Sequence, residues 1–368
     1  MARQLGLAIT TTPPALLVLA VLGLLTGLIV TLLLSYTGQS SASAAAQALA
    51  KRLSPLFDVV FLAALVPSAI VLLLFRRFGA RRLRLSRTCL QRLGVFPIRD
   101  HYYEPIFRAS QLSKPLHSER RLPGISFNLE RQLAFVNSLS WAEELTRFPL
   151  RSARRGNTSP EFYFGNGGFE SGDAEIWYLV VRNLKPKRII EIGCGFSTIL
   201  AHEAVNANSL EVPGYRCQHI CIEPYEQPWL ENLGVKVIRE RVERLDRSTF
   251  SDLQENDILF IDSSHVLRPQ GDVITQILEI LPTLQKGVTI HFHDIFSPRD
   301  LPHEWLFEFV WFWYEQYLLE AFLSCNPAFE VVCSVNYLKH AHFDCLRRKC
   351  VRLTPEREPG SFYIKKVS

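Results

Sequence analysis

Two short segments carry carboxylate and imidazole side chains directly after apolar runs. Asp262 and His265 follow one such run, and His293 and Asp294 follow the next. If the two runs are neighbouring strands, Asp262 and Asp294 face each other, and facing carboxylates are costly unless a cation or a proton lies between them. Oxygen ligands suit Mg²⁺. Such a cation would hold vicinal oxygens of a substrate and lower the pKa of one hydroxyl, and His265 would accept its proton.

An acidic residue followed by a Gly-x-Gly turn stands earlier in the chain, as Glu191-Ile-Gly-Cys-Gly195. Gly193 and Gly195 let the backbone turn tightly and approach a bound ligand, which a Cβ would block. The dinucleotide-binding fingerprint has a third glycine where this chain has Thr198. The turn therefore departs from the pattern expected of a nicotinamide cofactor site.

A second carboxylate follows the next apolar run, at Glu223, about thirty residues after the glycines. In this position a carboxylate can accept hydrogen bonds from both hydroxyls of a ribose. It would also stabilise the start of a helix, since Pro224 suits a first helical position. Glu223 therefore predicts a cofactor that contains ribose without naming it.

These residues need a framework that brings them to one place. From residue 185 onward, short apolar runs alternate with helix-length polar segments, which is typical of a parallel sheet with crossover helices. In such sheets ligands bind beyond the carboxyl ends of the strands, where the glycines and carboxylates stand. We predict an α/β, Rossmann-like, seven-stranded sheet with flanking helices. The predicted strands are 188–192, 218–222, 235–238, 258–261, 288–292 and an edge pair at 329–335 and 362–366, with helices to about 207 and across 273–284 and 304–323.

From about Tyr163 onward the chain resembles class I S-adenosylmethionine-dependent methyltransferases. The resembled branch holds the macrocin-type sugar O-methyltransferases and the cephalosporin-hydroxylase-like proteins. The resemblance implies that Glu191 contacts the methionine part of the cofactor and that Gly193, Gly195 and Ser197 line its site. It also implies that Glu223 holds the ribose.

The same resemblance assigns the reaction centre. It implies that Asp262 lies beside the cofactor and binds a metal, that His265 is the catalytic base, and that an acidic pair after the next strand completes the metal site. Asp294 matches one member of this pair, and His293 stands where the other carboxylate is expected. The implied metal is Mg²⁺ or another divalent cation, and imidazole favours softer ions. The implied reaction is O-methylation of a small polar or sugar-like acceptor.

Two other functions stay open at this stage. One is an NAD-dependent oxidoreductase of the same fold, against which the missing third glycine argues. The other is a non-catalytic scaffold anchored to a membrane, which predicts no turnover with any acceptor.

Three further features have structural interpretations. His291 is either a core histidine or part of the site. The cysteine–histidine group near residue 345 matches no zinc template well; its members are His340, His342, Cys345 and Cys350. An aromatic stripe at helical spacing indicates a helix packed on the sheet rather than a platform for the acceptor; it consists of Trp305, Trp311, Trp313, Tyr314 and Tyr317.

The N-terminal part contains two apolar runs, which predict transmembrane helices at about 13–35 and 57–75. The first could instead be a cleaved signal peptide, and the second a buried core helix, because it contains Pro67 and follows Asp58. An arginine run follows the second: Arg76, Arg77, Arg81, Arg82, Arg84, Arg87 and Arg92. The positive-inside rule places this run in the cytoplasm.

The predicted organisation is a membrane anchor over 1–80, a basic linker and helical cap over 81–160, and a methyltransferase domain over 161–368. The catalytic domain would lie at the cytoplasmic face of the membrane. A bilayer and a small-molecule, glycan or lipid-linked acceptor are then the expected partners. Nucleic acid is not, because the net charge of +5 comes from the local arginine run.

Overall fold

The computed structural model describes residues 44–152 and 161–368, which fall into two compact units, 1–107 and 108–368. The predicted transmembrane helix at 13–35 lies outside the described residues. The unit boundary also differs from the predicted one, because residues 108–152 contribute to the core of the second unit. Val136, Leu139 and Leu145, for example, are buried in it.

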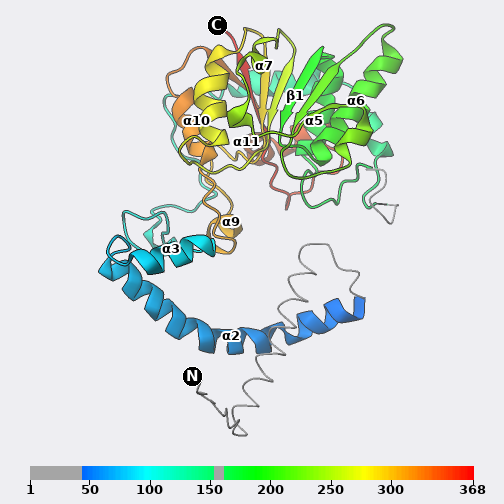
Figure 1. Ribbon diagram of the computed structural model, residues 1–368. Helices are drawn as coiled ribbons and strands as arrows, with labels where there is room; N and C mark the ends of the chain where they lie inside the picture. The colour runs from blue at the N-terminus through cyan, green and yellow to red at the C-terminus, as the bar shows by residue number, and fades with distance from the viewer. Residues whose placement is uncertain (1–43, 153–160) are drawn as a thin grey trace, which may run out of the picture. The chain divides into compact units, whose positions relative to one another are not determined.

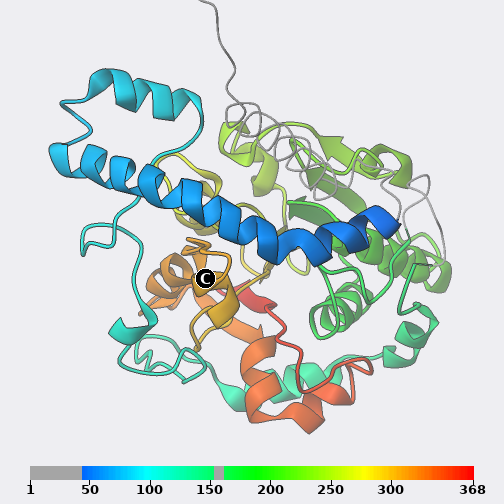
Figure 2. The ribbon, with the colours of Figure 1, turned by 90° about the horizontal axis from the view of Figure 1, so that it is seen from below.

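The first unit contains α2 (Ala44–Phe78) and α3 (Arg84–Arg92), drawn in blue and cyan in Figures 1 and 2. Residues Ser54–Phe78 of α2 have a mean hydropathy of 2.5 over their most apolar stretch, and they are long and apolar enough to cross a membrane. This segment contains the predicted helix 57–75. Within the described residues α2 already includes Ala44, well before the predicted start at 57, and residues 44–50 are rich in alanine, the strongest helix former.

The second unit is built on a mixed sheet, which has seven strands within the described residues, in the order β3-β2-β1-β4-β5-β7-β6. The first five strands in the sequence run parallel, and β7 is antiparallel to both of its neighbours. The strands are β1 (Arg188–Ile192), β2 (Gln218–Ile222), β3 (Lys236–Ile238), β4 (Ile258–Ile261), β5 (Thr289–Phe292), β6 (Phe329–Ser334) and β7 (Phe362–Lys366). The predicted fold class and strands are therefore confirmed, with shifts of one residue at three strand ends.

Helices and short helical turns cover both faces of the sheet, and each face has its own apolar core. One core contains residues of α4 (Leu129–Ser138), η2 (Ala142–Arg147), α5 (Asp173–Leu184), α6 (Phe196–Glu211), α11 (Val335–Ala341) and α12 (Phe343–Arg347). The other contains residues of η4 (Val242–Arg244), α7 (Ser248–Ser251), α8 (Asp272–Ile274), η5 (Thr275–Ile280), η6 (Leu281–Thr283) and α10 (Glu315–Leu323). Because buried strands alternate their side chains, Ile189 packs into the first core and Ile190 into the second.

The predicted cap is part of this packing. Arg182 is buried on α5, and its guanidinium pairs with Glu144 of η2 at 2.8 Å and with Glu211 of α6 at 2.9 Å. The Cζ atom of the same guanidinium also lies 4.5 Å from the centroid of the Trp141 ring, as in a cation–π contact. Through these contacts the segment around η2 is attached to α5, and Arg182 also joins α5 to α6.

The predicted aromatic helix 304–323 is wrong. The chain forms a short helix, α9 (His303–Phe307), and then an irregular segment up to Tyr314, before α10 begins at Glu315. Within the irregular segment Val310 has φ 56°, a left-handed conformation that a β-branched residue rarely adopts and that a continuous helix does not contain. Trp313 forms an isolated antiparallel bridge with Val266. The break thus carries Trp313 to the ends of the strands.

Candidate active site

A cavity of about 870 Å³ lies where the carboxyl ends of β1, β2, β4 and β5 meet. The loop that follows each of these strands lines the cavity. The segment 166–169 and Trp313 line it as well. The convergence follows from the parallel pairing, because parallel neighbours end at the same edge of a sheet.

The glycine turn after β1 uses its two glycines differently. Gly193 has φ +82°, and a Cβ at this position would collide with the carbonyl oxygen of Asp262 in the neighbouring turn. Gly195 has extended backbone, and a Cβ there would meet no protein atom within 4 Å. Gly193 therefore allows two strand ends to pack together, and Gly195 leaves space in the cavity.

Glu191 lies behind the turn rather than in the cavity lining. Its buried carboxylate accepts hydrogen bonds from Ser197 Oγ at 3.2 Å and Thr198 Oγ1 at 2.7 Å, and lies 2.7 Å from His219 Nε2. Burial alone would lower the pKa of His219, but the Glu191 carboxylate outweighs it and raises this pKa to about 10. Ser197 is one of the residues that line the cavity, and Glu191 is not. Glu191 is therefore not placed for direct contact with a cofactor in this cavity.

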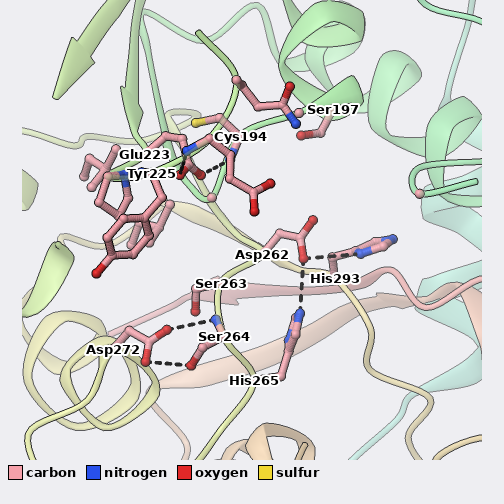
Figure 3. Close-up of a pocket in the computed structure, with 18 of the residues that line it drawn as sticks. Cys194, Ser197, Glu223, Tyr225, Asp262, Ser263, Ser264, His265, Asp272 and His293 are labelled. Carbon is pink, nitrogen blue, oxygen red and sulfur yellow. Dashed lines mark hydrogen bonds and ion pairs between the residues drawn. The ribbon is translucent and has the colours of Figure 1, made fainter. Parts of the chain in front are cut away.

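Glu223 joins the end of β2 to the glycine turn (Figure 3). Its Oε1 accepts hydrogen bonds from the backbone N–H groups of Tyr225 at 2.9 Å and Glu226 at 3.0 Å, and its Oε2 accepts one from Cys194 N at 3.4 Å. Pro224 opens a turn here rather than a helix. The carboxylate lines the cavity, as the sequence predicts for a ribose ligand, and it also holds the local backbone.

Asp262, His265 and Asp294 lie together in the lining of the same cavity. His265 Nε2 is 3.3 Å from Asp262 Oδ1 and 3.6 Å from Asp294 Oδ2. Among the described residues these three form one group whose ligand atoms all lie within 4.8 Å of one another, close enough to hold a metal ion. His265 and Asp294 both have left-handed backbone, with φ 58° and 61°, a conformation that costs energy outside glycine and concentrates at functional sites.

His293 approaches the same carboxylates from another side. Its Nδ1 is 3.6 Å from Asp262 Oδ1 and 3.4 Å from Asp294 Oδ1, and its Nε2 is 3.7 Å from Asp173 Oδ2. Figure 3 shows the two imidazoles on different sides of Asp262. The sequence predicted His293 beside the aspartate pair and His265 as a separate base, but the structure brings both rings to the pair.

Glu315 is a site residue that the sequence analysis missed. Its buried carboxylate lies 2.8 Å from His265 Nδ1, and its backbone N–H donates to the carbonyl of His265. Trp313 packs on the imidazole of His265, with ring centroids 4.5 Å apart. No spacing links Glu315 to His265 in the sequence, and a carboxylate at the start of a helix is an ordinary feature.

The ionisation of the cluster follows from these contacts. Burial opposes charge on both imidazoles, but Asp262 and Glu315 raise the pKa of His265 well above its usual value. Asp294 and Asp262 do the same for His293. Burial would raise the pKa of Asp262, but the two imidazoles lower it. These contacts therefore favour the charged forms of Asp262 and of the two imidazoles.

The turn after β4 is also held by hydrogen bonds to Asp272. Asp272 accepts hydrogen bonds from the backbone N–H and the Oγ of Ser264, both at 2.8 Å, as Figure 3 shows. Burial would raise the pKa of Asp272, but these bonds lower it. The turn between Asp262 and His265 is thus held rigid.

The three remaining features have the following places. His291 is fully buried in the core, where its Nε2 lies 2.8 Å from Ser361 Oγ and its ring stacks on Tyr363 at 4.1 Å. His340 lies 2.9 Å from a carboxylate oxygen of Glu358, and Cys350 is buried. The zinc interpretation gains no support among the described residues, because the metal-competent group found there lies at the cavity instead.

Comparison with known proteins agrees with this fold. Residues 190–295 match the family model of a methyltransferase domain. A protein of uncharacterised function from Archaeoglobus fulgidus is 26% identical over 175 residues, which are 45% of this chain and 76% of that protein.

Comparison with solved structures also found matches at low sequence identity, of which three follow. The O-methyltransferase TomG of Streptomyces achromogenes, involved in tomaymycin synthesis and solved with SAM, is 12% identical over 64% of this chain and 89% of that chain (TM-score 0.33). CmcI, solved with Mg and SAM, is 13% identical over 62% and 86% (TM-score 0.33). CalS11, a TDP-rhamnose 3'-O-methyltransferase of calicheamicin biosynthesis, is 13% identical over 67% and 99% (TM-score 0.34). With the sheet order and the family match, the second unit carries a class I methyltransferase domain.

Proposed function

We propose that this protein is an S-adenosylmethionine-dependent O-methyltransferase that acts on a small polar or sugar-like acceptor at a membrane. The observation that carries the proposal is the single cavity shared by Gly195, Glu223, Asp262 and His265. Its volume of about 870 Å³ leaves room for a nucleoside cofactor and part of an acceptor, since ligand pockets commonly measure about 300–1,000 Å³.

The cofactor would lie along the ends of β1 and β2. Gly195 leaves the space beside the glycine turn, Ser197 lines it, and Glu223 offers carboxylate oxygens to the ribose hydroxyls. Glu191 would act indirectly, because its bonds to Ser197 and Thr198 fix the start of α6. Bound S-adenosylmethionine would supply an electrophilic methyl group on a positively charged sulfur.

The acceptor hydroxyl would lie between Asp262, His265 and Asp294. His265 Nε2 would take the hydroxyl proton, and the acceptor oxygen would receive the methyl group while the electron pair of the carbon–sulfur bond stays on the sulfur of the departing cofactor. An imidazole can take this proton only when it is neutral, and the carboxylates around His265 favour its charged form. A divalent cation at Asp262 and Asp294 would offset these carboxylates and lower the pKa of the acceptor hydroxyl.

Asp262 and Asp294 would hold such a cation, because their carboxylate oxygens lie within 4.8 Å of one another and hard oxygen ligands suit divalent cations. His293, whose Nδ1 lies beside both carboxylates, would be a further ligand, and His265 would stay free to take the proton. Glu315 would keep the Nε2 of His265 directed at the acceptor by holding its Nδ1.

The membrane part of the proposal rests on α2. Its apolar span Ser54–Phe78 would anchor the chain, and the arginines that follow would face the cytoplasm. The acceptor would then be a soluble small molecule or a glycan or lipid-linked compound at that surface. Retention of the chain in membranes after extraction at high pH, and its loss after deletion of residues 1–107, would support the anchor; release of the full chain would contradict it.

The cofactor is tested by calorimetry with S-adenosylhomocysteine and, separately, NAD, on the full chain in detergent. We expect saturable binding of S-adenosylhomocysteine, no binding of NAD, and loss of binding in folded Glu223→Gln protein, which keeps the amide oxygen that can accept the backbone hydrogen bonds of Tyr225 and Glu226. Binding of NAD alone, or wild-type affinity in the variant, would contradict the proposed site.

A further inference from the structure

A row of aromatic rings runs from the reaction centre to the surface of the second unit. Trp313 lines the cavity, packs on the imidazole of His265, and stacks on Trp311 with ring centroids 4.1 Å apart. Phe309 in turn stacks on Trp311 at 4.7 Å. These three side chains belong to the irregular segment 308–314, here called the aromatic loop, which follows α9 where this helix projects from the second unit in Figure 1. The aromatic loop therefore connects the cavity with the outer surface.

The outer end of the aromatic loop exposes apolar side chains. Phe309 is 48% exposed and Val310 is 43% exposed. Val310 also keeps its left-handed backbone, because the N–H groups on either side of it are held: Phe309 N donates to the carbonyl of Glu304, and Trp311 N donates to that of Trp305. The fold thus directs two apolar side chains outward at a cost in backbone strain, and such strain concentrates at functional sites.

Charge and area limit what this tip would bind. Its exposed neighbours Glu304 and Glu308 are acidic, which disfavours nucleic acid or an acidic protein surface as the partner. The tip consists of two side chains, whereas a stable protein interface buries at least about 1,000 Å². Entry into a bilayer requires no such area, because each apolar side chain that leaves water contributes by itself. Tryptophan behind an apolar tip also suits the boundary between lipid and water.

The same chain supplies the bilayer. Its span Ser54–Phe78 is long and apolar enough to cross a membrane, and an anchored chain keeps its catalytic unit beside the lipid. We propose that Phe309 and Val310 insert into the apolar part of the bilayer, with Trp311 at its surface, so that the cavity opens beside the membrane. The inference rests on the membrane part of the proposed function and adds to it a second lipid contact, at the active site. An acceptor held in the bilayer would then reach His265 along the aromatic loop.

Quenching of tryptophan fluorescence by brominated lipid measures this contact directly. The full chain is reconstituted into neutral phosphatidylcholine vesicles, with or without bromine on the acyl chains, because bromine quenches a tryptophan that it contacts. Three of the six tryptophans, Trp305, Trp311 and Trp313, lie in α9 or the aromatic loop, and α2 contains none. We expect brominated lipid to quench the emission, and to do so equally when the salt concentration is raised tenfold, because the contact is apolar.

Variants assign the quenching to the tip. Phe309→Ser combined with Val310→Gly should reduce it at least twofold, while the affinity for S-adenosylhomocysteine and the retention of the chain in vesicles stay as in wild type. Val310→Gly alone carries little risk to the fold, since glycine adopts left-handed backbone readily, and should reduce quenching by a smaller amount. Leu210→Ser is the matched control, because Leu210 is 90% exposed on α6 and lies outside the cavity lining.

The outcomes separate the loop from the anchor and from the chemistry. Retention of the chain without quenching, quenching that disappears at high salt, or equal quenching in the folded double variant would each overturn the inference and leave the anchor in place. A dimer in detergent that the double variant converts to a monomer, without quenching in vesicles, would assign the tip to a second copy of the chain and overturn it too. Release of the chain from vesicles at high pH would refute the anchor and the inference together. Binding of S-adenosylhomocysteine on the same samples decides the methyltransferase independently.

Discussion

The two glycines of the turn after β1 should separate folding from cofactor binding when each is replaced by alanine. Gly193 has φ +82°, and the left-handed conformation costs alanine about 1–2 kcal/mol. Its Cβ would also collide with the backbone carbonyl of Asp262, which no side-chain rotation can relieve, and overpacking of this kind costs about 1–3 kcal/mol more. We therefore expect Gly193→Ala to lower the free energy of unfolding by about 2–5 kcal/mol.

Gly234 provides the matched control for the backbone cost. It has φ +74°, and a Cβ there would meet no atom within 4 Å, so Gly234→Ala carries the conformational strain without the collision. Gly195 has φ −175° and open space around it, and its replacement should leave stability within about 1 kcal/mol of wild type. Gly195→Val, however, would fill cofactor space and weaken S-adenosylhomocysteine binding at least tenfold, which is about 1.4 kcal/mol.

Thermal unfolding and calorimetric binding, run on all the variants, test this reasoning. For a domain of this size about 1 kcal/mol corresponds to about 2–4 °C in the midpoint. We expect the midpoint to fall most for Gly193→Ala, less for Gly234→Ala and hardly for the Gly195 variants, which alone lose binding while folded. If Gly193→Ala is as stable as Gly234→Ala, or if Gly195→Val binds the cofactor normally, the two assigned roles are incorrect.

Three further outcomes are expected. Glu315→Gln should lower kcat at least tenfold with little change in KM for the cofactor, since it loosens His265 without touching the cofactor end of the cavity; steady-state kinetics check this, and an equal rise in KM would refute it. The pKa of His219 is raised to about 10, so the stability from its pair with Glu191 is complete below the unfolded pKa of about 6.5 and is lost as pH rises toward 10. Denaturant unfolding of His219→Gln should lack this fall between pH 6.5 and 10, and an unchanged slope would count against the pair. Deletion of residues 1–107 should leave a folded unit, because the core of residues 108–368 is separate; aggregation without a cooperative melt would argue otherwise.

The strands could be predicted closely because each is a short apolar run bounded by glycine, proline or charge. Their carboxyl ends also placed Glu223, Asp262 and Asp294 correctly, since parallel pairing fixes which residues meet. The prediction of one helix over the aromatic segment failed for a physical reason: helical spacing of large side chains does not reveal a residue with left-handed backbone such as Val310. Glu315 could not be found, because only the folded chain brings it to His265.

Glu191 illustrates a different limit. Its position in the motif was clear, but the sequence did not show that Ser197, Thr198 and His219 occupy its carboxylate. A residue can therefore stand in a binding motif and serve the ligand only through its neighbours. Gly193 also stands in the binding motif, but its missing side chain makes room for the carbonyl of Asp262 in the neighbouring turn rather than for a ligand.

The position of β7 has a consequence for how the protein is made. This strand comes last of the seven along the chain and yet lies inside the sheet, between β5 and β6. Until residues 362–366 are in place, β5 and β6 each lack their β7 partner, and unpaired edges are the parts of a sheet most prone to wrong pairing. Completion of the sheet therefore has to wait for the strand that comes last of the seven.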